Sequence, residues 1–130
     1  MSSIINASVS SNGIVSTADA SGILQIQSNG VNTNAQAWVR FNGVTTVTIN
    51  ASYNISSVVR NGTGDYTINF TNALTDGNYS FASMGNNSSA AFTILNDSSA
   101  APTSSALRIQ TKSGANIAAD SPYVGVLIFR

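Results

Sequence analysis

The sequence predicts an all-β protein, either an antiparallel β-sandwich or a jelly-roll-like barrel. Apolar and polar residues alternate with a period of two along several short segments, which is the pattern of strands with one buried face. Clusters of Gly, Asn, Asp, Ser and Pro separate these segments about every eight to twelve residues. No segment of the 130 residues shows the apolar repeat of an ordinary helix.

The segment from residue 37 to residue 74 carries the strongest strand and turn signals. It contains two Asn-Gly steps, Asn42-Gly43 and Asn61-Gly62. Because two-residue turns with positive φ at both central positions favour Asn-Gly, we expect a tight hairpin at the first step and a longer turn around the second. The strands of this block are expected to follow one another as a β-meander. Alternation after the first turn predicts one buried face, formed by Val47, Ile49, Ala51, Tyr53 and Ile55.

Most of the expected core comes from this block. For Trp38 two interpretations are open: burial in the core, which its position among Val39, Phe41 and a hairpin favours, or an exposed indole that stacks on a sugar. The large side chains expected in the core are Trp38, Phe41, Ile49, Tyr53, Tyr66, Ile68 and Phe70.

The chain is expected to divide into an N-terminal β arm and linker over 1–36 and a β-sandwich domain over 37–130. Short apolar segments in the arm predict weak strands at 4–9, 13–16 and 23–27, before a polar loop at 28–36. Past the central block, strands are expected from residue 79 and at 91–95, 107–112 and 123–129, separated by long loops at 96–105 and 113–122.

The final expected strand differs from the others because it is apolar on both faces. Tyr123, Leu127 and Phe129 point to one side, and Val124, Val126 and Ile128 point to the other. A sandwich of this size can bury one of these faces in its own core, whereas the second face needs another layer. The strand therefore predicts association with another subunit.

Composition excludes several classes of partner. Charged residues make up 8% of the chain, against roughly 25% in an average soluble protein, and the formal net charge is zero. The five basic residues are scattered, so the chain lacks the basic patch that nucleic acid requires. No apolar stretch approaches the ~20 residues that span a bilayer, and no basic segment followed by an apolar run marks a secretory signal. We expect neither nucleic-acid binding nor membrane insertion.

The residue inventory also argues against catalysis. Without His, Cys or Glu there is no catalytic triad, thiol nucleophile or imidazole base. Each of the five aspartates lies in a turn context, where Asp is expected to cap its own backbone. No window has the spacing of an EF-hand calcium loop. We therefore expect no enzyme activity, no cofactor and no metal site, and the aspartates so interpreted are Asp19, Asp65, Asp76, Asp97 and Asp120.

The order of these motifs resembles a recurrent module of tailed bacteriophages. In that module a W-V-x-F-[ND]-G hairpin precedes an N-[IV]-S-S-[IV] strand and an NGTGDYT-[IV]-NF hairpin. The run NGTGDYT is the most specific part, and the segment 16–31 also resembles sequences found just upstream of the module. The matching positions, about half of the chain, are 37–43, 51–59, 61–74 and, more loosely, 79–84.

This resemblance implies a non-enzymatic virion structural protein on the particle exterior. The expected role is a tail-fibre or receptor-binding component that recognises a host-surface glycan or protein through its loops. The alternative is a capsid decoration protein that stabilises the phage head through its arm; the lead of about 36 residues favours it, because fibre proteins usually carry a longer shaft there. Both kinds of protein are commonly trimeric, so the expected partners are further copies of the chain, in a homotrimer, and other virion proteins.

Overall fold

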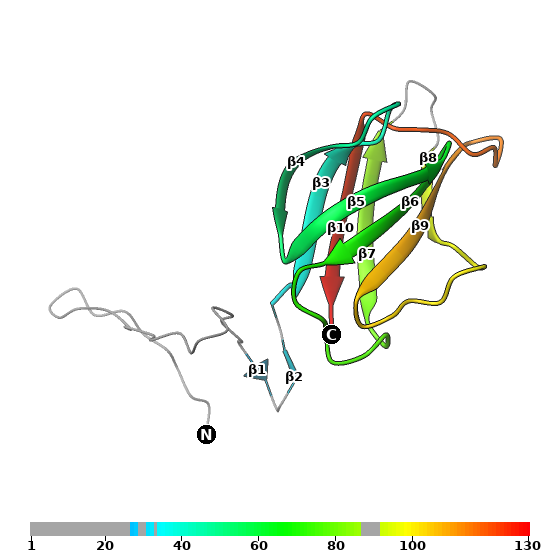
Figure 1. The fold of residues 1–130 in the computed structure, drawn as a ribbon. Helices are drawn as coiled ribbons and strands as arrows, with labels where there is room; N and C mark the ends of the chain where they lie inside the picture. The colour runs from blue at the N-terminus through cyan, green and yellow to red at the C-terminus, as the bar shows by residue number, and fades with distance from the viewer. Residues whose placement is uncertain (1–26, 29–30, 33, 87–91) are drawn as a thin grey trace, which may run out of the picture.

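The computed structural model describes residues 27–28, 31–32, 34–86 and 92–130. Over these residues the protein is an antiparallel β-sandwich without helices, which confirms the predicted fold class. Two four-stranded sheets pack face to face and are not closed into a barrel (Figure 1). The strands expected before residue 27 lie outside the described residues.

Each sheet combines strands that are distant in sequence. The β10 sheet has the order β4-β3-β10-β7, and the β6 sheet has the order β5-β6-β9-β8, with every neighbouring pair antiparallel. A short hairpin of β1 (Gln27–Ser28) and β2 (Val31–Asn32) forms where a polar loop was expected. The sandwich strands are β3 (Ala37–Asn42), β4 (Thr48–Tyr53), β5 (Ile55–Gly62), β6 (Asp65–Phe70), β7 (Ser80–Asn86), β8 (Phe92–Asn96), β9 (Ala106–Ser113) and β10 (Tyr123–Phe129).

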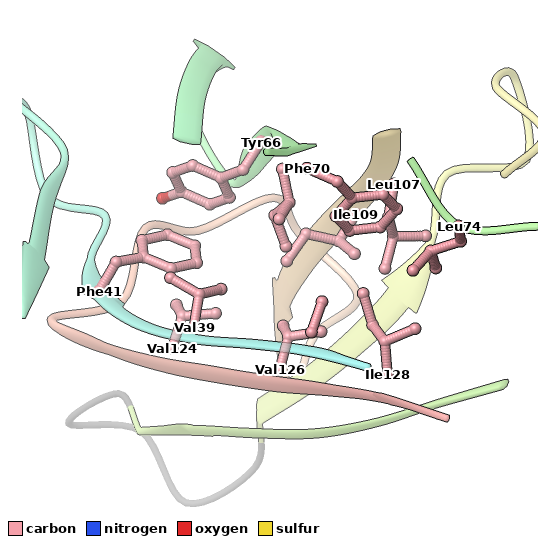
Figure 2. Close-up of a cluster of buried hydrophobic side chains, with 12 residues drawn as sticks. Val39, Phe41, Tyr66, Phe70, Leu74, Leu107, Ile109, Val124, Val126 and Ile128 are labelled. Carbon is pink, nitrogen blue, oxygen red and sulfur yellow. The ribbon is translucent and has the colours of Figure 1, made fainter. Parts of the chain in front are cut away.

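The core lies between the sheets and is built by strict alternation along four strands. Every second residue of β3 and β10 points inward, toward the alternate residues of β6 and β9 that point inward from the opposite sheet (Figure 2). The rings of Phe41 and Tyr66 meet edge to face, with centroids 5.2 Å apart. The core predictions for Phe41, Tyr66, Ile68 and Phe70 are confirmed, and these residues pack with Val39, Leu107, Ile109, Val124, Val126 and Ile128.

Three residues expected in the core are exposed instead: Trp38 and Ile49 are 36% exposed and Tyr53 37%. Trp38 points outward because its neighbours at 37 and 39 take the inward positions of β3. On the edge strand β4 all six residues are exposed. A β-bulge between Arg40 and Phe41 shifts the register, so alternation along β4 does not define one buried face.

The expected β-meander is also wrong, because the chain changes sheets at Asn54. This residue has a positive φ of 57°, which asparagine tolerates better than most residues, and it separates β4 in one sheet from β5 in the other. Its side-chain amide donates to the carbonyls of Gln36 and Asn72, each at 3.1 Å, and its Oδ1 accepts from the backbone N–H of Asn72. The Asn54 side chain thus fixes the corner between the sheets.

Neither Asn-Gly step forms the turn that was expected there. Between β3 and β4 the chain reverses over residues 43–47, and positive φ occurs at Thr45 rather than at Gly43. Gly43 is required for a different reason: an added Cβ would lie 2.4 Å from the Tyr66 hydroxyl oxygen. The tight reversal is at the second site, where Gly64 has a φ of 66° between β5 and β6.

Candidate functional site

The outer faces of the two sheets differ sharply in chemistry. The outer face of the β6 sheet is mostly polar, with Val59 and Leu95 as its exposed apolar residues. Its polar side chains are Asp65, Thr67 and Asn69 on β6 and Arg108, Gln110 and Lys112 on β9. The outer face of the β10 sheet, which we call the apolar face, carries six of the large exposed apolar side chains. They are Trp38, Tyr53, Met84, Tyr123, Leu127 and Phe129, with exposed fractions from 36% to 68%.

Strand register aligns these side chains across the sheet. Tyr53 pairs with Trp38, which pairs with Leu127, and Phe129 lies two residues further along β10. Residues in register project to the same side, so the four form a continuous apolar band, which we call the apolar rows. Because Val124, Val126 and Ile128 occupy the core side of β10, the predicted second face of this strand is the one left open.

The other half of the apolar face contains a hollow of about 300 Å³. Arg40 pairs with Gly125, and Gly125 pairs with Met84. Met84 lies over this glycine, because an added Cβ would be 2.7 Å from the Met84 Cγ. The Arg40 guanidinium carbon lies 5.4 Å from the centroid of the Tyr123 ring, a cation–π geometry. We call this site the Arg40 hollow; Asn86 also lines it.

Arg40 is the one arginine of the described residues without a carboxylate partner. Arg60 binds Asp120 at 2.8 Å, Arg108 binds both Asp65 and Asp97, and Arg130 binds Asp76. The positive charge of Arg40 is therefore not neutralised by any side chain in the described part of the chain. Among the residues that the structure describes, it is also the only charged group that lines the hollow.

The aspartates serve the fold, although only two of them cap local backbone as expected. Asp76 accepts from the N–H of Asn78, and the buried Asp97 accepts from the N–H and hydroxyl of Ser99. All four also bind arginines, but Asp65 and Asp120 do not cap the backbone that follows them: Asp65 binds Arg108 of β9, and Asp120 binds Arg60 of β5 and the distant Gly64 N–H. The fifth, Asp19, lies outside the described residues.

Asp120 is the centre of a polar network that includes the buried Tyr66 hydroxyl. Its carboxylate accepts from Arg60, from the Gly64 N–H at 2.8 Å and from the Tyr66 hydroxyl at 2.6 Å. The hydroxyl is also 3.0 Å from the Gly43 carbonyl oxygen, so these two acceptors share its one hydrogen. Burial alone would raise the pKa of Asp120, but the hydrogen bonds from Arg60, Tyr66 and Gly64 hold it below its usual value.

These contacts predict how stability depends on pH. The pKa values of Asp65, Asp76, Asp97 and Asp120 are all lowered in the folded protein by their hydrogen-bond donors. The unfolded chain therefore takes up protons first on acidification, so stability is full above the ordinary Asp pKa of about 4 and falls as the pH drops through the folded values.

At alkaline pH stability changes in the opposite direction, because it falls as the pH rises. Burial raises the pKa of Tyr79 to about 12, and also raises that of Tyr66, so the unfolded chain loses these protons first. Urea midpoints are expected to stay level between about pH 5 and pH 7, then to fall below about pH 4 and above about pH 10. A midpoint that rises between pH 4 and pH 3 would contradict the role of the aspartates.

The chain matches no family model, no curated protein and no solved structure. In the part of the chain that the structure describes, no helix is long and apolar enough to cross a membrane. The same residues contain no group of three or more His, Cys, Asp or Glu side chains placed to hold a metal ion.

Proposed function

We propose that the protein is a non-enzymatic structural subunit on the exterior of a tailed-bacteriophage virion, in a tail-fibre or receptor-binding component. The resemblance to the phage module supports this proposal, and the fold gives its motifs a physical role. Gly43 of the AWVRFNG motif contacts Tyr66 of the NGTGDYT motif, and Gly64 of the second motif donates to Asp120. The two most specific motifs thus meet at one structural network, as expected for residues that build a subunit rather than a catalytic centre.

The single observation that carries the proposal is the apolar face. Taking about 200 Å² for a large side chain, the four residues of the apolar rows expose on the order of 300 Å², and Met84 and Tyr123 bring the whole face to about 500 Å², at the upper end of patches on ordinary monomers. A standard interface buries about 800 Å² on each partner, so this face has the size of an interface centre. We assign the apolar rows to contact with a neighbouring subunit, and the three-fold symmetry comes from the resemblance.

The aspartates support a role without catalysis. A general acid needs a raised pKa, whereas all four described carboxyls have lowered values and bind arginines. Where two of them converge, Asp65 and Asp97 share the guanidinium of Arg108. That arrangement stabilises both carboxylates in the charged form.

Location in the particle tests the proposal. Virions are purified on a density gradient from a lysate that contains the protein, and antibody against the recombinant chain is detected with gold in the electron microscope. We expect label at the tail. Label on the head surface would replace this assignment with the capsid decoration role, and purified particles that lack the chain by mass spectrometry would overturn the virion assignment.

A further inference from the structure

The Arg40 hollow combines a charge that has no carboxylate partner among the described residues with an apolar lining. The Arg40 guanidinium lies over the Tyr123 ring, and the Met84 side chain covers Gly125. Arginine presents a planar set of donors that matches a carboxylate in a two-pronged geometry. A single guanidinium balances the single charge of a carboxylate, whereas a phosphate monoester carries nearly two charges at neutral pH. A carboxylate therefore matches Arg40 in both charge and geometry, and a phosphate monoester does not match it in charge.

The shape of the hollow indicates what carries that carboxylate. Met84 is 68% exposed and Tyr123 51%, so a bound molecule would rest on them with its other side in water. A wholly apolar ligand would leave much of its surface exposed there. A sugar ring fits better, because one face presents C–H groups to apolar and aromatic surfaces while its hydroxyls remain hydrated. Asn86 at the rim offers an amide that can donate to or accept from such hydroxyls.

We propose that the Arg40 hollow binds the carboxylate of an acidic saccharide of the uronic acid type. Arg40 binds the carboxylate, and Met84 and Tyr123 support the sugar ring. This inference rests on the receptor-binding role proposed above and names the chemical class of the receptor. Because the hollow is open, a single site binds weakly, and an assembly gains affinity by presenting several hollows to one polysaccharide.

The experiment is a nuclear magnetic resonance titration of the full chain with sodium glucuronate at constant ionic strength. The amide signals of Gly85 and Gly125 and the Arg40 Nε–H are expected to shift saturably, with a dissociation constant in the millimolar range. Glucose, which lacks the charge, is expected to bind at least roughly tenfold more weakly, because a charge-assisted hydrogen bond is lost. Equal shifts with glucose, or no saturable shift with glucuronate, would overturn the proposal.

Two variants of Arg40 and one control test which group binds the carboxylate. Arg40→Gln is expected to weaken glucuronate binding at least roughly tenfold, and Arg40→Lys less, because lysine keeps the charge without the two-pronged geometry. Lys112→Gln is the matched control: it removes a cation on the β6 sheet, which also has no ion pair among the described residues, and should leave binding unchanged. Equal losses in Arg40→Gln and Lys112→Gln would mean that only the overall charge matters, which would overturn the assignment to the hollow.

Two further measurements distinguish a saccharide ligand from an acidic protein partner, and binding from assembly. The α-amide of N-acetylaspartic acid carries a single side-chain carboxylate on a peptide-like body, and binding as tight as that of glucuronate would replace the saccharide with an acidic protein partner. Arg40→Gln should sediment with the same mass as the unmodified chain, since Arg40 lies outside the apolar rows. If glucuronate does not bind, the proposed ligand is wrong but the proposed virion role is not affected. If the chain is absent from virions, the virion role is wrong but the measured binding is not affected.

Discussion

Replacing Phe41 with alanine is expected to lower the free energy of unfolding by about 3–5 kcal/mol. The Phe41 side chain is fully buried and packs edge to face on Tyr66 at the centre of the core. Its removal leaves a cavity between the sheets in addition to the lost transfer free energy. A loss of this size approaches the whole stability of a small domain, so urea unfolding at low temperature is the suitable measurement.

Trp38→Ala is the control for this prediction. Trp38 is on the same strand and is larger, yet it points outward and keeps 36% of its surface exposed. Its truncation in the monomer is expected to cost at least about 2 kcal/mol less than that of Phe41, because less apolar surface returns to water. Equal losses in both variants would mean that the inward and outward faces of β3 are assigned wrongly.

The second large effect is expected from Asp120→Ala, which removes the acceptor shared by Arg60, Tyr66 and Gly64. Tyr66 keeps the Gly43 carbonyl as acceptor and Arg60 keeps the Thr63 hydroxyl, but the buried Gly64 N–H loses its acceptor. Leaving a buried donor without an acceptor costs about 1–3 kcal/mol. The loss of stability should also remove part of the acid limb of the pH profile, since Asp120 is one of the four carboxyls with a lowered pKa.

Asp76→Ala provides a matched comparison. Asp76 also binds an arginine, Arg130, but both groups are about one-third exposed. Exposed ion pairs contribute little to stability, so this variant should unfold close to the unmodified chain. If Asp76→Ala is as destabilising as Asp120→Ala, the network around Tyr66 has no special structural role.

Sequence periodicity predicted the strands that form the centre of the sandwich. In β6 and β9 apolar residues alternate cleanly with polar ones, so both strands were predicted and Tyr66 and Ile68 were correctly assigned to the core. The last strand was correctly expected at 123–129, and it lies inside a sheet: β10 pairs with β3 on one side and β7 on the other. These strands are central, where burial enforces the pattern.

Predictions from periodicity were wrong at the edge of the sheet and where the chain passes from one sheet to the other. The alternation from Val47 to Ile55 looks continuous, but a left-handed residue at Asn54 divides it between two sheets. The bulge beside Arg40 is a long-range feature of strand pairing that no local pattern records. Gly43 illustrates the same limit, because it is needed for contact with Tyr66, 23 residues away, and not for a tight turn.

The candidate site was only partly visible in the sequence. The second interpretation of Trp38, an exposed indole, agrees with its position in the structure, and the open side of β10 was anticipated. Arg40 was missed because its isolation depends on the positions of all other charges. The signal available was its spacing from Trp38: two residues apart on one strand, both had to share a face. Its contact with Tyr123 required the pairing of β3 with β10.

Sedimentation equilibrium at micromolar concentration tests most directly whether the apolar rows are an assembly interface. The unmodified chain is expected near three times its mass of 13.4 kDa. Leu127→Lys, at the centre of the apolar rows, should shift it to a monomer, whereas Val59→Lys, an exposed apolar position on the β6 sheet, should leave the mass unchanged. A monomeric unmodified chain, or variants that sediment alike, would contradict the account.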